Sequence, residues 1–482
     1  MIILVGSKID QASIHNSLGK PEYSYFFLMK DFLPVLERVA GMEIVQSLEQ
    51  IEQLAEHYRS IGEEVVYLSF SPPHQVPLGL SCPTVCVFAW EFDTLPSIAW
   101  EGNPQNDWRY TFSHIQGAIS TSREAAALVR EAMPAGYPVV ALPAPVWDRY
   151  RIEQPAAGKP MMAERGFPFA GVVIDSPTLG LSADGLVRKP EVVIAPPVDE
   201  VPEQSRLRQA WLTTSALAAG WWREMRKAEI AEEKSPAPRM VAEPAPEPEV
   251  RRIVVSGVVY TTVLNPADSR KNWVELITAF CWAFKDRQDA TLIVKMTHHD
   301  LEYYRIVLMT LLSRLAPFAC RVVVLHGFLQ DEQYRQLIAA SNYYVNASSG
   351  EGLCLPLMEF LSAGVPVIAP THTAMADYVD DQLAFTIKCA LEPFCWPHDP
   401  TGIFMTHRHR LNWQSLVEAY QQSYQVITQS PEKYRDMAMK ADARMRAFAS
   451  IGQVAGPLEE FLGRVAGGQA SHEKAGLAGS EA

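Results

Sequence analysis

Residues 348–370 read SSGEGLCLPLMEFLSAGVPVIAP, and this stretch decides which fold the chain is expected to adopt. The apolar run NYYVNA precedes it and VPVIA closes it, so two strands with a helix between them are predicted. Pro356 suits the first turn of that helix, where the missing N–H of proline is not needed, and Gly364 suits its end. Glu351 therefore falls in a loop after the first strand, and Glu359 falls in the first turns of the helix.

These two glutamates indicate a ligand site at one edge of a sheet. Ligands of open α/β sheets bind at the carboxyl ends of parallel strands. Free N–H groups at a helix start favour anions such as a diphosphate. Taken singly, each glutamate has an ordinary structural explanation, as a solvated loop residue or as a favourable charge near a helix start. The two together, among these glycines and prolines, favour a binding site.

Strand and helix patterns alternate along most of the chain. The runs MIILV, EVVYLSF, TVCVFAW, GAIST and PVVAL predict strands in the first part, several of them too apolar for a sheet with one wet face. Thr121 and Glu124 fit a capping box for the helix that follows GAIST. A second series begins with RIVVSGVVY as one strand and ends with the opening stretch. We expect an α/β protein with two Rossmann-like, doubly wound parallel-sheet domains that face a cleft.

The domain boundaries follow from where these patterns stop. An acidic, Pro-rich segment from Glu229 to Arg251 is predicted to be an extended, disordered linker. We predict an N-terminal, acceptor-side domain at 1–150, an insertion with an amphipathic helix and the linker at 151–250, a C-terminal donor domain at 251–405, C-terminal helices that cross back to the first domain at 406–465, and a disordered tail at 466–482.

Composition restricts the class of protein. With 42 Lys and Arg against 55 Asp and Glu, the net charge of −13 argues against a nucleic-acid partner. Seven cysteines without a C-x-x-C pair favour reduced thiols in a cytoplasmic protein. The apolar run at the N-terminus is too short for a signal peptide, and no stretch approaches the roughly 20 apolar residues of a membrane span.

The segment 205–228 carries an apolar face with Leu207, Trp211 and Trp222 between basic residues. Two interpretations stay open. One is a helix docked on the body of the protein. The other is an interfacial helix whose tryptophans insert into a membrane, which would place the protein peripherally on the inner face of that membrane.

The opening stretch resembles the E-x7-E region of retaining GT-B glycosyltransferases, in particular family 4. That pattern reads S-x-x-E-G-[FL]-G-L-P-x-x-E-A-x-A-x-G-x-P-V-[IV]-A, and this chain departs from it at Cys354, where glycine is usual, and at Phe360, where alanine is usual. The resemblance implies that Glu351 contacts hydroxyls of the donor sugar and that Glu359 contacts the ribose of the nucleotide. The neighbouring residues expected at the donor are Gly352, Leu353, Cys354 and Leu355. Because its side chain narrows the sugar pocket, Cys354 is the expected place of sugar selectivity.

Further matches extend the resemblance over the second domain. DSRKNWVELITAF is similar to the basic segment of the family and makes Arg270 and Lys271 candidates to hold the diphosphate, although here they adjoin instead of lying several residues apart. Lys295 ends a predicted strand where many members carry Gly-x-Gly, and is the candidate for a substitute phosphate contact. For each of these three cations the alternative is a solvated surface residue.

Two loops complete the expected donor site. His326, Gly327 and Phe328 stand where the backbone of the family often receives the base. PTHTAMADYV resembles a loop that usually reads G-x-x-E. Backbone N–H groups around Thr373 and Ala374 are expected to face the diphosphate.

The first domain matches more loosely. FAWEFDTLP resembles an acceptor-domain segment with the pattern E-x-x-x-L-P, which makes Glu91 and Asp93 candidates for an acceptor hydroxyl. SKIDQASIHNSLGKP stands in place of the common N-terminal Gly-Gly loop. No Asp-x-Asp triplet occurs, and the histidines at 298–299 and 407–409 lack further ligands at metal spacing, so we expect no metal and no cofactor.

The resemblance implies transfer of a sugar from a UDP- or GDP-sugar, with retention of configuration, to a glycan, lipid-linked or other hydroxyl acceptor in polysaccharide or glycoconjugate biosynthesis. Lys271, Arg270 and Glu351 are the expected catalytic residues. One alternative is a hydrolase in which Glu351 and Glu359 act as an acid/base pair, against which the basic residues argue. The other is a catalytically silent GT-B-like subunit that binds sugar or acts as a scaffold.

Overall fold

A computed structural model of the chain describes residues 1–7, 22–151, 162–182, 211, 214–215, 250–298, 300–397, 399 and 401–478. Apart from residues 211, 214–215 and 250–251, the predicted amphipathic helix at 205–228 and the linker at 229–251 lie outside the described residues. Most of the segment in place of the Gly-Gly loop lies outside them as well. Residues 1–183 and 250–482 belong to one structural unit. Among the helices described, none has both the length and the hydrophobicity that a membrane crossing requires.

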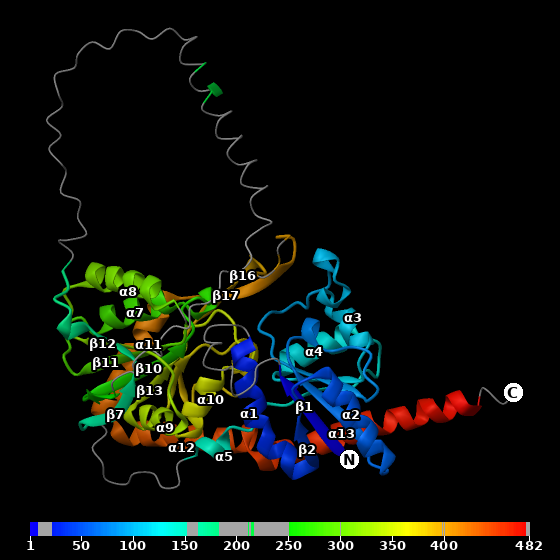
Figure 1. The fold of residues 1–482 in the computed structure, drawn as a ribbon. Coiled ribbons are helices and arrows are strands. Elements are labelled where there is room, and N and C mark those ends of the chain that lie inside the picture. Colours follow the sequence, from blue (N-terminus) through cyan, green and yellow to red (C-terminus); the bar gives the residue numbers. More distant parts are fainter. Residues whose placement is uncertain are drawn as a thin grey trace. The chain divides into compact units, whose positions relative to one another are not determined.

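The N-terminal half contains a six-stranded parallel sheet in the order β2-β1-β3-β4-β5-β6. Its elements are the blue and cyan ones in Figure 1, where β1, β2 and the helices α1 to α4 are labelled. Its strands are β1 (Ile2–Ser7), β2 (Gly41–Ile44), β3 (Val65–Phe70), β4 (Thr84–Phe88), β5 (Gly117–Ser120) and β6 (Val139–Ala141). Its helices are α1 (Glu22–Val39), α2 (Leu48–Ser60), α3 (Trp108–Ser113), α4 (Arg123–Ala132) and α5 (Trp147–Tyr150).

Strand β3 shows why these runs are continuously apolar. Val66 and Leu68 pack in the same core as Phe32 of α1, whereas Val65 packs in a separate core with Ile51 of α2. Because successive side chains of a strand point to opposite faces, a strand with a helix on each face must be apolar at every position. All six residues of β3 are accordingly buried.

The C-terminal half contains a seven-stranded sheet in the order β15-β14-β13-β10-β11-β12-β8, parallel except for β8. Its strands are β8 (Val172–Asp175), β10 (Val258–Leu264), β11 (Ala290–Met296), β12 (Arg321–His326), β13 (Tyr343–Val345), β14 (Val367–Ala369) and β15 (Ala384–Thr386). The helices between them are α7 (Trp273–Ala283), α8 (Leu301–Leu315), α9 (Asp331–Ala340) and α10 (Leu355–Ser362). The predicted α/β class with two Rossmann-like parallel sheets is confirmed.

Three local predictions were wrong. RIVVSGVVY is two strands, β9 (Val250–Val255) and β10, because Gly257 has φ 72° and a Cβ there would lie 2.1 Å from the carbonyl oxygen of Asp289. β9 pairs with β7 (Arg165–Ala170), so β7 and β8 make part of the predicted insertion a component of the second half. Helix α4 is capped by Ser122 in place of Thr121, whose hydroxyl is used elsewhere.

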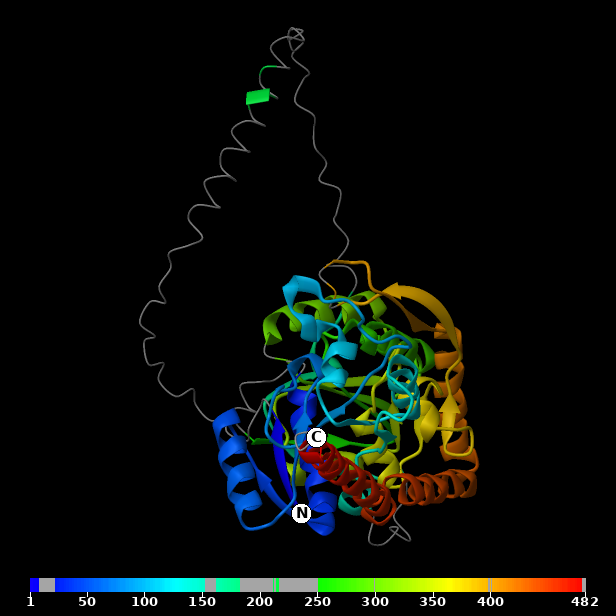
Figure 2. The ribbon, with the colours of Figure 1, turned by 90° about the vertical axis from the view of Figure 1, so that its right-hand side faces the viewer.

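The chain ends in a hairpin and three helices. They are β16 (Cys389–Cys395), β17 (Met405–Leu411), α11 (Trp413–Gln429), α12 (Pro431–Ala449) and α13 (Ile451–Ala478), and the orange-to-red succession of the helices is visible in Figure 2. Leu458 and Phe461 of α13 lie in the core that also contains Phe32 of α1. Helix α13 continues past residue 466, where a disordered tail was predicted.

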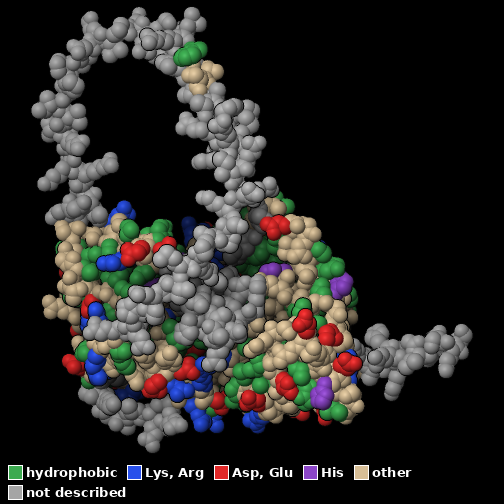
Figure 3. Space-filling model, viewed as in Figure 1, with side chains coloured by type: hydrophobic (Ala, Val, Ile, Leu, Met, Phe, Trp, Pro, Cys, Tyr) green, Lys and Arg blue, Asp and Glu red, His purple; other side chains and the backbone are tan. Residues whose placement is uncertain are grey.

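Charges on the surface are mixed. On the face shown in Figure 3, Lys and Arg side chains lie interspersed with Asp and Glu side chains. No broad basic area is visible on that face, as expected for a chain of net charge −13.

Candidate functional site

Four adjacent strands of the second sheet bring the candidate residues to one edge. In the order β14-β13-β10-β11, Thr373 follows β14, Glu351 follows β13, Lys271 follows β10 and Lys295 lies near the end of β11. Because all four strands are parallel, their carboxyl ends share this edge. From β10 the chain proceeds to β11 and β12 on one side and then crosses to β13 on the other side of β10. Such a reversal of strand order is a topological switch point, where α/β sheets bind ligands.

Glu351 is the centre of the cluster. Only 4% of the residue is exposed, and its Oε1 accepts hydrogen bonds from Lys271 Nζ at 2.7 Å, Ser348 Oγ at 2.6 Å and Asn346 Nδ2 at 3.0 Å. Burial alone would raise the pKa of Glu351, but Lys271 and Arg270 hold that pKa below its usual value. The carboxylate is therefore ionised and held in one orientation.

Arg270 joins the two halves of the chain. It follows the capping residue Asp268 in the short 3₁₀ helix Ser269–Lys271, and its guanidinium contacts Asp268 at 2.8 Å and Glu91 of the N-terminal half at 3.0 Å. Burial raises the pKa of Glu91, and Arg270 opposes that effect. Glu91 thus lies beside Arg270 at the candidate site, and its role at an acceptor hydroxyl stays a prediction.

Lys295 differs from the other two cations. It is 4% exposed, and among the described residues it makes no ion pair or hydrogen bond. Burial lowers the pKa of Lys295 to about 7. A buried ammonium without a counter-ion is unfavourable, so this position favours an anionic ligand.

Glu359 lies deeper, on α10, and is 6% exposed. Tyr334 Oη donates a hydrogen bond of 2.6 Å to its Oε2. Burial and the nearby Asp31 raise the pKa of Glu359 to about 8, opposed by Tyr334 and Arg149. Arg149 itself bridges Asp31 and Asp331 at 2.8 Å each, so the surroundings of Glu359 come from both halves.

The loop 349–354 packs directly on the N-terminal half. The carbonyl oxygen of Gly352 accepts a hydrogen bond from Thr121 Oγ1 at 2.6 Å, and a Cβ at Gly352 would lie 2.8 Å from the backbone nitrogen of Trp90. Leu353 accepts a hydrogen bond from Tyr378 through its carbonyl, and Leu355 packs against the core. Glycine at 352 is required by this close approach of two backbones.

Backbone strain concentrates at the site. Among the described non-glycine residues, φ is positive at Glu101, Asn272, Cys354 and Thr373, and the last three lie at the candidate site. Cys354 has φ 65°, a conformation that glycine adopts without strain, which explains why glycine is usual there in the family that the sequence resembles. Strain of this kind is often held at functional sites.

This strain predicts an order of stability. Cys354→Gly is expected to be more stable than Cys354→Ala by about 1 kcal/mol, because both lose the contact between Sγ and Asn346 but only alanine keeps the steric clash at positive φ. Urea unfolding midpoints of the two variants check this order. Equal midpoints, or a more stable alanine variant, would contradict it.

The remaining candidates are placed as follows. His326 shares a hydrogen bond with the carbonyl of His298, and Gly327 packs against the end of β7. Phe328 is half-buried beside them. The N–H of Ala374 donates to the carbonyl oxygen of Glu351 at 3.2 Å, and is thus engaged within the loop instead of being free for a ligand.

Asp93 is the candidate that the structure does not bring to the cluster. Its carboxylate accepts hydrogen bonds from Thr406 Oγ1 at 2.9 Å and from the backbone N–H of His407 at 3.0 Å, and it lies 2.8 Å from the ring of His407. Asp93 therefore anchors the β16–β17 hairpin to the N-terminal half. No local sequence pattern indicates this contact, because the partners lie more than 300 positions apart.

Sequence reasoning missed Asn346, Tyr334 and His372. Asn346 and Tyr334 hold Glu351 and Glu359, and His372 lies beside Thr373. Each lies within a segment that the sequence singled out. A polar residue at the end of an apolar strand, as in NYYVNA, is the one signal that could have pointed to Asn346.

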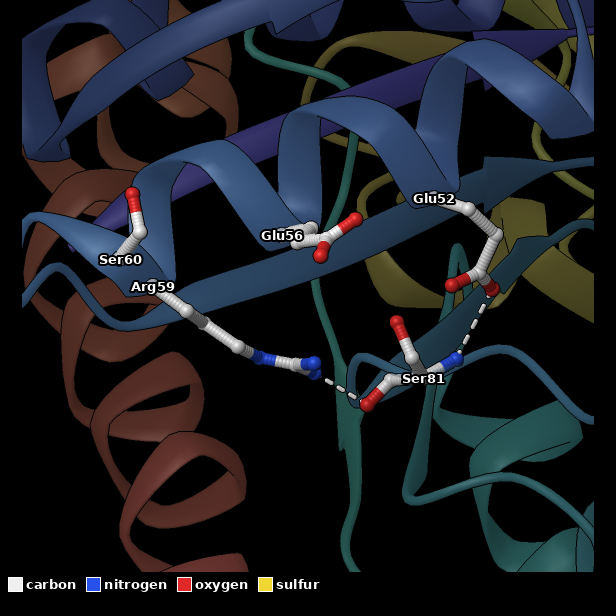
Figure 4. Close-up of a pocket in the computed structure, with 5 residues that line it drawn as sticks. All are labelled: Glu52, Glu56, Arg59, Ser60 and Ser81. Atoms are coloured by element: carbon white, nitrogen blue, oxygen red, sulfur yellow. Dashed lines mark hydrogen bonds between the residues drawn. The ribbon is translucent and has the colours of Figure 1, made fainter.

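A surface pocket of about 510 Å³ lies elsewhere, beside α2, and is shown in Figure 4. It is lined by Glu52, Glu56, Arg59, Ser60 and Ser81. Arg59 and Glu52 are both hydrogen-bonded to the backbone of Ser81. None of the candidate residues lines this pocket.

In the described part of the chain, no group of three His, Cys, Asp or Glu side chains is arranged to hold a metal ion.

Comparison with known proteins agrees with this geometry. The fold superposes on that of HepE from Anabaena, solved in complex with UDP, with a TM-score of 0.51 and 13% identity over 96% of this chain and 99% of that one. At this identity the likeness shows the fold, which is the predicted GT-B arrangement. Residues 262–393 match the family model described as glycosyl transferases group 1. The segment that carries the candidate site therefore matches this family model, which confirms the predicted resemblance.

Two further structures match with TM-scores below 0.5. HepE in complex with UDP-glucose gives a TM-score of 0.49 at 14% identity, over 96% of this chain and 99% of that one. The pneumococcal O-GlcNAc transferase GtfA, in complex with UDP and GlcNAc, gives 0.41 at 11% identity, over 86% of this chain and 60% of that one. In sequence, no curated protein matches the chain.

Proposed function

We propose that the chain is a retaining glycosyltransferase that binds a nucleoside-diphosphate sugar at the edge formed by β14, β13, β10 and β11 and transfers the sugar to a hydroxyl of a glycan, lipid-linked or other acceptor. UDP is the proposed nucleotide, since the group 1 match covers the donor half and the structurally similar HepE was solved with UDP. Glu351 binds sugar hydroxyls and Glu359 binds the ribose.

The observation that carries this proposal is the charge arrangement at the sheet edge. Arg270 and Lys271 are matched by Asp268, Glu91 and Glu351, whereas Lys295 is buried without a counter-ion. A diphosphate would supply the missing negative charge. Carboxylates beside the diphosphate would accept hydrogen bonds from hydroxyl groups. One edge of the sheet therefore offers cations for the diphosphate and carboxylates for the hydroxyls of a nucleotide sugar.

The arrangement suits the chemistry of transfer. Breaking the bond between the sugar and the diphosphate places negative charge on the leaving oxygen, and cations fixed in a buried site stabilise that charge most in the transition state. The leaving oxygen can take the proton of the attacking hydroxyl on the same face of the sugar. This route needs no separate base and retains the configuration. Glu91, held by Arg270, is the proposed contact for the acceptor.

Lys295 provides the test. In Lys295→Met, the affinity for UDP is expected to fall by about 10-fold or more, whereas the affinity for uridine stays unchanged, because only UDP carries the charge that the ammonium meets. Isothermal titration calorimetry with both compounds, with and without Mg²⁺, measures this. Lys285→Met, at an exposed lysine of the same half, is the matched control and should bind both as the wild type does.

The outcomes separate the alternatives. An equal loss of uridine and UDP binding in Lys295→Met would mean that the residue only supports the fold. Absence of UDP and GDP binding in the wild type would refute the donor site. Binding of UDP without transfer from any nucleotide sugar would favour the silent subunit.

A further inference from the structure

His372 is a buried histidine that the proposed reaction does not yet use. It lies in the loop after β14, directly before Thr373, and 9% of it is exposed. Its Nε2 atom is fully enclosed and has no hydrogen-bond partner. A buried polar atom without a partner costs about 1–3 kcal/mol and calls for an explanation, such as a ligand.

The hydrogen bonds around Thr373 fix the tautomer of this ring. Thr373 Oγ1 lies 2.7 Å from the carbonyl oxygen of His372, which can only accept, so the hydroxyl proton points there. The same Oγ1 accepts from the backbone N–H of Glu351 at 3.0 Å. His372 Nδ1, 3.3 Å from Oγ1, must then be the donor in that contact. A proton on Nδ1 of a neutral ring leaves Nε2 as an acceptor.

The ring of His372 is neutral, and a stacked neighbour fixes the orientation of its plane. Burial, followed by the neighbouring His409, lowers the pKa of His372 to about 3, so it carries no charge at physiological pH. His409 of β17 stacks on it with ring centres 3.9 Å apart and an angle of 5° between the planes. The backbone N–H of His409 donates to the carbonyl oxygen of Ser349, which ties the stack to the loop of Glu351. The direction of Nε2 is therefore set by the surrounding structure.

The chemistry of the missing partner follows from these contacts. An acceptor nitrogen requires a donor, which excludes the oxygens of an ionised diphosphate and selects a hydroxyl or an N–H group. The loop that carries His372 is joined to the loop of Glu351, the residue assigned to sugar hydroxyls, by two hydrogen bonds. We infer that His372 is a specificity-determining residue whose Nε2 accepts a hydrogen bond from a hydroxyl of the transferred sugar. This inference rests on the proposed function.

Entry of the sugar requires the loop to be uncovered. Gly352, in the same loop as Glu351, is in backbone contact with Trp90 of the N-terminal half. Parting of the two halves at this contact would uncover the loop of Glu351, to which the loop of His372 is hydrogen-bonded, and their return would enclose the sugar. Hinge closure over substrates is a common device in enzymes of two domains.

The test compares UDP with UDP-sugars in the full chain. His372→Phe keeps an aromatic ring for His409 but removes both nitrogens, whereas His372→Gln offers an acceptor oxygen near the position of Nε2. UDP, UDP-glucose, UDP-galactose, UDP-N-acetylglucosamine and UDP-glucuronic acid serve as probes in calorimetry. For the UDP-sugar that the wild type binds best, His372→Phe is expected to lower affinity about 10-fold with UDP affinity unchanged, and His372→Gln is expected to recover part of the loss. His57→Phe, at an exposed histidine, is the control and should leave both affinities unchanged.

The outcomes distinguish this inference from the proposed function. If His372→Phe lowers the affinities for UDP and the UDP-sugar equally, or changes neither, the inference is wrong while the donor site stands. If the wild type does not bind UDP, the proposed function fails and the inference fails with it. Thermal unfolding of the variants separates a loss of fold from a loss of the sugar contact.

Discussion

Replacement of Lys271 with methionine is expected to lower the rate of sugar transfer by roughly 10²–10³-fold, the loss typical when one stabilising group for transition-state charge is removed. The ammonium of Lys271 is proposed to contact the diphosphate, and it holds Glu351 at 2.7 Å. Both roles disappear with the charge. Single-turnover transfer from a labelled UDP-sugar, once a donor has been identified by calorimetry, measures the effect on the chemical step.

The control for this prediction must allow for stability. Removal of Lys271 leaves Glu351 ionised, buried and short of one partner, and breaking a buried ion pair from one side typically costs about 3–5 kcal/mol. The double variant Lys271→Met with Glu351→Gln removes the unpaired charge and should regain stability without regaining transfer. Recovery of transfer along with stability would show that Lys271 acts only through the fold.

Relative to Glu359→Gln, the wild type is expected to lose free energy of unfolding as the pH rises from about 6 to about 8. The comparison of the two proteins cancels the opposite contribution of Lys295, whose pKa burial lowers to about 7. Burial raises the pKa of Glu359 to about 8, so across this range the folded state holds a proton that the unfolded state has already lost. Stability contributed by the protonated carboxyl is complete at low pH and is lost as the pH passes through the folded pKa. One such group changes the free energy by at most roughly 1.4 kcal/mol per pH unit.

The pH range of this prediction starts at about 6 because burial also raises the pKa of Asp31 to about 6. Below that pH both carboxyl groups contribute to the change of stability with pH. Urea unfolding at several pH values between 6 and 8 gives the slope for the wild type and for Glu359→Gln, which can still accept the hydrogen bond from Tyr334. Glu332→Gln, at an exposed glutamate, should keep the slope of the wild type. An identical slope in Glu359→Gln would show that Glu359 is ionised in the folded protein.

Much of the second half could be predicted from its sequence because the signals are local. Pro356 and Gly364 bound a helix by backbone chemistry alone, and continuous apolar runs such as TLIVKM follow from burial on both faces of a parallel sheet. The strand order then brings Glu351, Lys271 and Lys295 to one edge without any further information. The same local reasoning failed at Gly257, where a close approach to Asp289 breaks what the sequence presents as a single strand.

What could not be predicted depends on contacts between distant segments. The sequence around Thr121 is typical of a helix cap, but the hydroxyl of Thr121 donates to the carbonyl oxygen of Gly352, 231 positions away. Asp93 has the appearance of a ligand residue, yet it anchors a hairpin. Tyr334 belongs to helix α9 and Asn346 directly follows strand β13, and the patterns of these elements do not indicate the glutamates that the two residues hold. These roles arise only when the two halves and the strand ends are placed in space.

A crystal structure of the chain soaked with UDP would show whether the edge formed by β14, β13, β10 and β11 binds the nucleotide. We expect phosphate oxygens within hydrogen-bond distance of Lys295 and Lys271, and the ribose hydroxyls at Glu359 in place of the hydroxyl of Tyr334. UDP bound at another part of the surface, with Lys295 still without a partner, would refute the proposed donor site.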